Sequence, residues 1–381
     1  MKFVPSNIVL LFAVLSVGQA ASAHSLEAKF DEKTGTITIH REGLVKPVVT
    51  QNAAADHRPY LHPIIGPDGN GVFTEYSPGH HKHQTGIYWG FTRVNGRDYF
   101  HNPAGKYWKR KGVKVLEAKG ESVKWETVYD LLDADGNEVL TETQRWSMTS
   151  ENDRHILNLE WQGTGQTDVT IGKYSYGGLF VRMPWQKGIK GEAVNAARDS
   201  NRRAEGKRAM WLDVGMEING LDDWGHIAIF DHHKNAGYPQ PWRVDGQLGV
   251  GPVRARLGDW KIAQGKTETI RHQIHVYSGK LDDKDLTNRW KAYTGQRGTY
   301  ALWQLAKRAG REAKFLSPQE AVENSTIEDG FTVNSWANEP MITQPMAFCW
   351  DDKGRMWVAE NRDYETRGRG FSASGDSRIL I

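Results

Sequence analysis

The stretch SVKWETVYDLLD, residues 122–133, alternates apolar and polar side chains and leads into the turn sequence DADGNE at residues 133–138. Alternation with a period of two is typical of a β-strand with one buried face, and the Asp- and Gly-rich turn predicts a hairpin. The same alternation recurs in four other runs, at residues 35–43, 154–163, 226–233 and 269–279. Short strands, polar turns and few helical runs predict an all-β fold, a large antiparallel β-sandwich, over residues 24–280.

The first 23 residues have the pattern of an export signal. A positive start, Met1-Lys2, precedes an apolar run at residues 8–17 and the small-residue sequence ASA at 21–23. This pattern predicts cleavage before His24 and a secreted or periplasmic protein. The apolar run is shorter than the roughly 20 residues that a membrane span needs, so an uncleaved N-terminal anchor is only the alternative.

Composition excludes some classes of partner and leaves others open. The chain has 49 basic and 46 acidic residues, a net charge of +3, which gives no case for nucleic acid as a partner. Its single cysteine, Cys349, excludes an intrachain disulfide. The 15 tryptophans fit either core packing or stacking on sugar rings.

The pattern changes after residue 280. Helical spacing predicts a helix at residues 282–296 and a second helix or linker at 299–315, within a helical linker over 281–315. Ser317-Pro318 has the pattern of a helix start, and short strands around a DDKG turn follow at 331–364. The chain stops inside an apolar strand, so we expect a larger C-terminal partner domain.

Four stretches of the β-rich region carry a resemblance to a known family: RPYLHPIIGPDG (58–69), HHKHQTGIYWGFTRVNGRDYF (80–100), WLDVG (211–215) and IAIFDHHKNAGYPQPW (227–242). On these, residues 24–278 resemble a family of exported bacterial proteins labelled "methane oxygenase PmoA". The oxygenase activity in that label does not fit, because particulate methane oxygenase is an integral membrane enzyme and this region has no membrane span.

The C-terminal segment carries a second resemblance, in LSPQEAVENSTIEDGF (316–331), EPMITQPMAFCWDDKGRMWVAENRDY (339–364) and DSRILI (376–381). Residues 316–381 resemble the start of an exported "membrane-bound dehydrogenase" family whose members carry a sugar-dehydrogenase-like β-propeller. The resemblance implies an incomplete propeller here. The chain has no C-x-x-C-H motif, so neither haem nor any other cofactor is assigned.

The segment SPGHHKHQTGIYWGF, residues 77–91, concentrates three histidines before a run of aromatic residues. In an extended strand, side chains two residues apart share a face, which predicts His81 and His83 on one side and His80 on the other. Two such histidines hold zinc or copper when further ligands converge. The candidates for a third ligand are His62, Glu75, Asp231, His232, His233, His272 and His275, but no spacing is diagnostic, and no metal is assigned.

A second interpretation is proton transfer on a sugar, because the pKa of histidine lies near neutrality. RPYLHPIIGP followed by the HHKH segment is similar to galactose-mutarotase-like sandwiches, in which a histidine and a carboxylate exchange protons with a sugar ring. The resemblance implies catalytic roles for His62, His81, His83, His232 and Glu75. Candidate substrate-binding residues are Arg58, Trp89, Arg93, Lys173 and Trp242. A third interpretation is structural, with the histidines packed against Tyr88, Trp89 and Phe91.

These observations together predict a secreted carbohydrate-active β-sandwich that binds or transforms a saccharide at a His-rich concave site. Two other classes stay open. One is a non-catalytic carbohydrate-binding module that tethers the dehydrogenase-like segment, and the other is a metal-dependent enzyme with histidine ligands.

Overall fold

The computed structural model describes residues 23–295, 316–361, 364–366, 370–371 and 377–381. The export signal predicted at residues 1–23 lies outside this range except for its last residue, and so does the helix or linker predicted at 299–315. Within these limits, no helix is both long enough and apolar enough to cross a bilayer.

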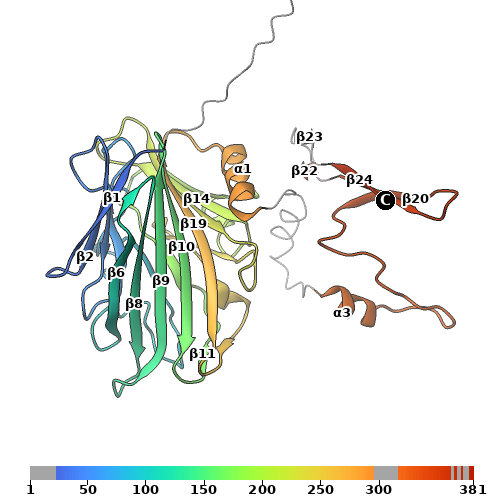
Figure 1. Cartoon of the computed structure of the whole chain (residues 1–381), viewed down its shortest axis with the longest axis horizontal. Helices are drawn as coiled ribbons and strands as arrows, with labels where there is room; N and C mark the ends of the chain where they lie inside the picture. The colour runs from blue at the N-terminus through green and yellow to red at the C-terminus, as the bar shows by residue number, and fades with distance from the viewer. Residues whose placement is uncertain (1–22, 296–315, 362–363, 367–369, 372–376) are drawn as a thin grey trace, which may run out of the picture.

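Two large antiparallel sheets pack face to face, which confirms the predicted all-β sandwich (Figure 1). The nine-stranded sheet contains, in spatial order, β16 (Trp242–Val244), β17 (Val250–Pro252), β12 (Gly178–Val181), β5 (Ile87–Gly90), β4 (Tyr60–Ile64), β3 (Val49–Asn52), β2 (Thr36–Arg41), β1 (Leu26–Asp31) and β7 (Lys119–Gly120). The eight-stranded sheet contains β13 (Gly191–Asn195), β14 (Trp211–Glu217), β15 (Trp224–Asp231), β19 (Thr267–Ser278), β10 (Arg154–Gly165), β9 (Glu138–Ser150), β8 (Ser122–Leu132) and β6 (Trp108–Glu117).

Smaller elements complete this region. β11 (Val169–Ile171) pairs with β18 (Trp260–Ile262), and two short 3₁₀ helices cover Asn201–Arg203 and Arg254–Leu257.

The hairpin predicted at the turn of residues 133–138 is the pair β8 and β9. The two strands are antiparallel and place Trp125 opposite Trp146. Between them the Asp133 carboxylate accepts hydrogen bonds from the backbone N–H groups of Asp135 and Asn137, at 2.9 and 2.8 Å. An aspartate that bonds the backbone two to four residues onward stabilises a tight turn, so this local sequence determines where the strands reverse.

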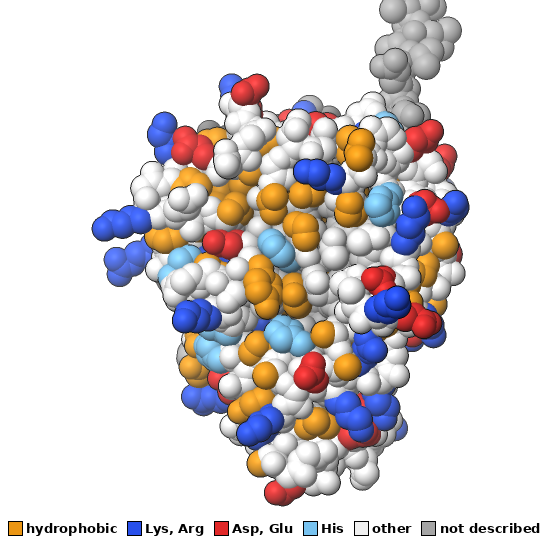
Figure 2. Space-filling model, turned by 90° about the vertical axis from the view of Figure 1, so that its left-hand side faces the viewer, with side chains coloured by type: hydrophobic (Ala, Val, Ile, Leu, Met, Phe, Trp, Pro, Cys, Tyr) orange, Lys and Arg blue, Asp and Glu red, His pale blue; other side chains and the backbone are white. Residues whose placement is uncertain are grey.

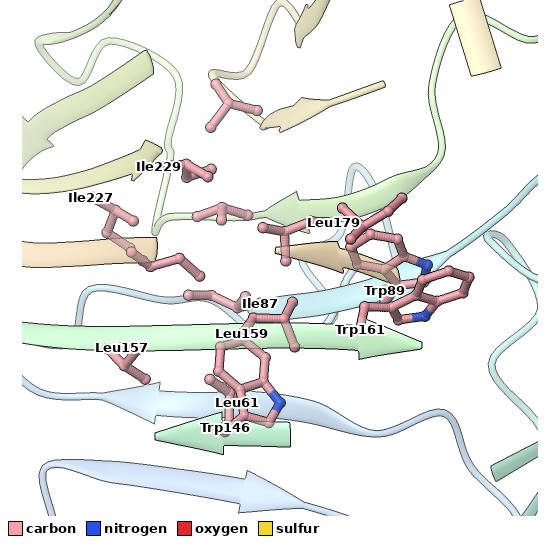
Figure 3. Packing of buried hydrophobic residues seen from close by; sticks show 14 of the residues in the cluster. Leu61, Ile87, Trp89, Trp146, Leu157, Leu159, Trp161, Leu179, Ile227 and Ile229 are labelled. Carbon is pink, nitrogen blue, oxygen red and sulfur yellow. The ribbon is translucent and has the colours of Figure 1, made fainter. Parts of the chain in front are cut away.

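The core between the sheets is rich in indole rings (Figure 3). Trp89 on β5 and Trp161 on β10 stack with ring centroids 4.7 Å apart, and Trp125 and Trp146 stack at 6.2 Å. All four are buried. Core packing therefore accounts for these tryptophans.

Helix α1 (Asp283–Thr294) packs onto the sandwich. Asp282 caps it by accepting from the N–H groups of Lys284 and Asp285. Leu286 and Trp290 are buried in a cluster with Met210, Trp211 and Phe230 of the eight-stranded sheet and its approach. The packed unit therefore extends to residue 294, beyond the boundary expected at residue 280.

The C-terminal segment contains α3 (Pro318–Glu323), which begins at the predicted Ser317-Pro318 with a capping box between Ser317 and Glu320. β20 (Pro345–Trp350), β21 (Met356–Glu360) and β24 (Arg378–Leu380) form a three-stranded antiparallel sheet, with the predicted DDKG turn between the first two. β22 (Tyr364–Thr366) pairs with β23 (Gly370–Phe371). Whether this segment begins a propeller stays a prediction.

Candidate functional site

The candidate site lies on the face of the nine-stranded sheet that points away from the core. On β5, Ile87 and Trp89 point into the core, while Tyr88 packs in a separate cluster with Phe100 and Phe180. Over this cluster lies a pocket of about 100 Å³. Its lining residues are His81, His83, Gln84, Phe100, His101, Tyr176, Phe180, Arg243 and Asp245. Figure 2 shows histidine and hydrophobic side chains gathered along the middle of the side on which β1 and β2 lie in Figure 1.

The histidine-rich segment is a turn and not a strand. The N–H of His81 donates to the carbonyl of Pro78 at 2.9 Å, and the N–H of Gln84 donates to the carbonyl of His81 at 3.0 Å. The prediction that His80 points away from His81 is therefore wrong, because side-chain alternation holds only for extended backbone. The Nδ1 atoms of His80 and His81 lie 2.7 Å apart, within hydrogen-bond distance. His81 and His83 do line the same pocket, with ring centroids 5.7 Å apart.

Three residues that the sequence did not single out form a chain of polar contacts into the pocket. His101 Nδ1 lies 2.6 Å from Asp98 Oδ2, and His101 Nε2 lies 3.3 Å from the hydroxyl of Tyr176. In the neutral tautomer whose Nδ1–H donates to the Asp98 carboxylate, Nε2 is the acceptor for the Tyr176 hydroxyl. The i, i+3 spacing of Asp98 and His101 was visible in the sequence, whereas nothing local pointed to Tyr176.

The pKa values of His83 and Tyr176 are shifted in opposite directions, so the two side chains differ as proton donors and acceptors. Burial first, and then the charges of His101 and Arg58, lowers the pKa of His83 to about 3. The His83 imidazole is therefore neutral at neutral pH, where it can donate or accept a hydrogen bond but is a weak base. Burial raises the pKa of the Tyr176 phenol above its ordinary value, so the phenol is protonated at neutral pH and can donate a hydrogen bond to His101.

Arg58, predicted to bind substrate, lies beneath the pocket and does not line it. It is fully buried, with its guanidinium carbon 3.8 Å from the centre of the Tyr88 ring. Its Nη1 donates to the carbonyl of Phe100 at 2.6 Å, and its Nη2 donates to the carbonyl of His83 at 2.7 Å. Arg58 is therefore a positioning residue that joins the histidine turn to the segment carrying His101.

The structure separates the other predicted binding residues from the pocket. Trp89 and Trp242 are buried, so their rings are not available to stack on a ligand. Trp242 donates its Nε1–H to the carbonyl of Ala209 at 2.9 Å. Arg93 and Lys173 are exposed, and the Arg93 guanidinium carbon lies 4.6 Å from the Tyr174 ring centre.

The remaining predicted catalytic residues also lie outside the pocket lining. His62 on β4 has its Nδ1 3.0 Å from the Thr74 hydroxyl. Glu75 follows, and its N–H donates to the carbonyl of Arg182. Burial, opposed by Arg182, raises the pKa of the Glu75 carboxyl. His232 comes after β15 of the other sheet, where its ring is 5.1 Å from Tyr293 of α1.

The metal interpretation gains no support from the geometry. Across the described part of the chain, no group of three or more His, Cys, Asp or Glu side chains is arranged to hold a metal ion. Of the residues proposed as third ligands, Asp231, His272 and His275 are buried in the eight-stranded sheet.

A larger groove, about 680 Å³, lies elsewhere. It is lined by Gln186, Lys187, Ile189 and residues 217–224, which include Glu217, Asp222 and Trp224. Its size alone favours it as a ligand site, but it lacks the convergence of imidazole, phenol and guanidinium groups found in the smaller pocket. Because chemistry depends on such groups, we place the candidate site at the smaller pocket.

Comparison with protein families gives a clear result for most of the chain. Residues 36–291 match the model of a Family of unknown function (DUF6807). The chain belongs to this family. Residues 317–381 match the model of a Domain of unknown function (DUF7133). Neither description names an oxygenase or a dehydrogenase, so both resemblances inferred from the sequence stay predictions.

No curated protein matches the chain. Among solved structures, it resembles the family 36 α-galactosidase AgaB from Geobacillus stearothermophilus, with 9% identity, a TM-score of 0.38, and coverage of 71% of this chain and 44% of that one. It also resembles Slr1438 from Synechocystis sp. PCC 6803, with 9% identity, a TM-score of 0.31, and coverage of 72% and 100%. The chain thus spans less than half of the galactosidase. At these TM-scores the likeness carries no argument about function.

Proposed function

We propose that residues 24–294 bind a saccharide in the pocket on the outer face of the nine-stranded sheet and transform it by proton transfer through Tyr176 and His101. The observation that carries the proposal is the chain Asp98–His101–Tyr176, which ends in a pocket with both aromatic and polar walls. The export signal predicted at residues 1–23 would bring this site to saccharides outside the cytoplasm.

The pocket walls supply what a sugar ring needs. A sugar presents apolar C–H faces and a rim of hydroxyls, so its sites combine aromatic rings with a few well-placed polar groups. Phe100, Phe180 and Tyr176 supply the rings. His81 and His83 supply hydrogen bonds, and the low pKa of His83 assigns it to binding and not to proton transfer.

The same contacts give each of the three residues a separate role in proton transfer. The Asp98 carboxylate holds the His101 ring in one orientation, with Nε2 next to the Tyr176 hydroxyl. When His101 accepts the phenolic proton, the Tyr176 oxygen becomes a base in contact with the ligand. Tyr176 is thus the catalytic residue, His101 its proton partner, and Asp98 a positioning residue.

The test is a comparison of binding and turnover in the full chain against a panel of neutral and acidic oligosaccharides. Tyr176→Phe should lower turnover about 10²-fold or more, the usual contribution of general acid–base catalysis, and change binding little. His83→Ala should weaken binding about tenfold, the value of one or two hydrogen bonds. Tyr107→Phe and His233→Ala are matched controls outside the pocket.

The outcomes distinguish an enzyme from a non-catalytic carbohydrate-binding module. Binding that His83→Ala weakens, without turnover in the unsubstituted chain, would identify a non-catalytic carbohydrate-binding module. Equal binding by His83→Ala and His233→Ala would place the site elsewhere and overturn the proposal.

A further inference from the structure

We infer that the ligand of this pocket is an acidic saccharide, whose carboxylate binds Arg243, and that the reaction is a β-elimination next to that carboxylate. The inference rests on the proposed function and adds the substrate class and the bond that breaks. The observations that carry it are the placement of Arg243 and the balance of charge around the pocket.

Arg243 is held in the pocket wall with part of its guanidinium free. It lies on β16 between Trp242 and Val244, which are both buried, so its side chain projects from the outer face of the sheet. Nη1 donates to Glu205 Oε1 at 2.9 Å, and the guanidinium carbon lies 5.6 Å from the centre of the Tyr176 ring. No residue in the described part of the chain accepts a hydrogen bond from its Nε or Nη2. Both nitrogens are therefore left to donate to a ligand.

The charges around the pocket leave a surplus of positive charge. Glu205 forms ion pairs with Arg243 and Arg256, so one carboxylate serves two guanidinium groups. Asp245 is the only carboxylate in the pocket lining, and it already pairs with Arg182 at 2.6 Å. No lining carboxylate is left over to bind a neutral sugar's hydroxyls. Just outside the lining, Asp98 faces His101, whereas the buried Arg58 has no carboxylate partner and adds to the positive charge. A ligand carboxylate would complete the charge balance, and guanidinium groups bind carboxylates through paired, charge-assisted hydrogen bonds.

The same arrangement suits proton removal beside a carboxylate. In a uronic acid, the ring carbon C5 carries both a hydrogen and the carboxylate, and negative charge develops on the carboxylate when that hydrogen leaves as a proton. Arg243 would stabilise this charge, because a fixed cation acts most strongly where charge develops in the transition state. The acceptor is the Tyr176 oxygen, whose own proton has moved to His101.

The elimination balances without another reactant. The C5–H bond breaks and its proton goes to the Tyr176 oxygen, while its electron pair forms a C4=C5 double bond. The C4–O bond breaks with its electron pair on the leaving oxygen, which takes the proton from Tyr176, and His101 returns its proton to the phenolate. The sugar loses a C–H and a C–O bond and gains a C=C and an O–H bond. Neither water nor an oxidant takes part.

The experiment compares matched ligands on the full chain. The probes are tetramers of galacturonate, glucuronate and mannuronate, each beside its carboxyl-reduced neutral counterpart. Calorimetry measures binding, and ultraviolet absorbance of the conjugated double bond measures elimination. At least one acidic tetramer should bind about tenfold or more tightly than its neutral counterpart, the effect of one charge-assisted hydrogen bond. The same tetramer should gain ultraviolet absorbance.

Substitutions assign the preference to one residue. Arg243→Gln should remove the preference for the acidic ligand and leave weak binding of the neutral one. Arg243→Lys, which keeps the charge, should keep part of the preference even if the glutamine variant folds poorly. Arg93→Gln is the matched control, because Arg93 also stacks on a tyrosine but lies outside the pocket lining.

The inference and the proposed function fail in different ways. Equal binding of acidic and neutral tetramers, or a preference that Arg243→Gln leaves intact, would overturn the acidic-ligand inference and leave the saccharide site standing. Tight binding of an acidic tetramer without ultraviolet absorbance would overturn the elimination step. Absence of binding by every acidic and neutral tetramer would count against the saccharide site itself.

Discussion

At the scale of single residues, the site depends on buried charge that has no partner of opposite sign. Arg58 is fully buried, and its guanidinium donates to the carbonyl groups of His83 and Phe100 and lies over the face of Tyr88, while its Nε has no hydrogen-bond partner among the described residues. Burial lowers its pKa to about 10, which still leaves it charged at neutral pH. This buried cation ties two loops together, because removing it would take away the donor that it gives to the carbonyls of His83 and Phe100.

Glu142 on β9 is a buried acidic residue in the core, as Arg58 is a buried basic one. Its shifted pKa predicts how the stability of the fold depends on pH. It accepts from Trp161 Nε1 at 2.8 Å and Gln144 Nε2 at 2.7 Å, and burial raises its pKa from 4.5 to about 7. Because the folded-state pKa is the higher one, the stability that the bound proton contributes is full below the unfolded pKa and is lost as pH rises through about 7.

Glu142→Gln should therefore remove this dependence. As pH rises from about 4 to about 8, the free energy of unfolding of the variant minus that of the unsubstituted protein should increase by about 3 kcal/mol. Urea unfolding of both proteins across this range measures the shift, and taking the difference cancels the titration of the buried histidines. A constant difference would show that Glu142 is not buried in its protonated form.

At the scale of elements, the sequence pattern predicts strands well and the site poorly. Alternation between residues 122 and 133 determines which side chains face the core, so β8 and its hairpin partner β9 were predictable. The HHKH segment was treated as extended, but Pro78 and Gly79 precede it and Gly86 follows with a φ of +77°. A Cβ at Gly86 would lie 2.3 Å from the carbonyl oxygen of Leu61, so this turn requires glycine there.

The sequence gives no local signal for side chains that are far apart in the chain and meet only in the folded protein. Tyr176 comes just before β12 and Arg243 lies on β16, and only the sheet order brings them to the same pocket as His83 and His101. Trp89 and Trp242 mislead for the opposite reason. They neighbour histidines in sequence, but alternation along their strands turns their rings into the core.

The packing of helix α1 against the sandwich predicts that the helix contributes to the stability of the folded unit. Trp290 is fully buried against the eight-stranded sheet, so Trp290→Ala should lower the free energy of unfolding by about 3–5 kcal/mol. Asn288→Ala, at an exposed position of the same helix, controls for the change in helix propensity. Urea unfolding monitored by circular dichroism compares the two variants. If they lose the same stability, the helix is not part of the packed unit and the folded region ends near residue 280.

At the scale of the whole molecule, the sandwich separates stability from function. The indole-rich core lies between the sheets, while the outer face of the nine-stranded sheet carries the aromatic and histidine side chains of the pocket. Substituting a pocket residue therefore opens no large cavity in the main core. This separation lets loops from distant parts of the chain contribute to one site on a rigid sheet.

The most direct test of the saccharide site is a crystal structure of the chain with the oligosaccharide that binds most tightly in calorimetry. We predict a sugar ring against Phe100, Phe180 or Tyr176, with hydroxyls within hydrogen-bond distance of His81 and His83. A sugar bound instead in the groove at residues 217–224, with the histidine pocket empty, would contradict the account.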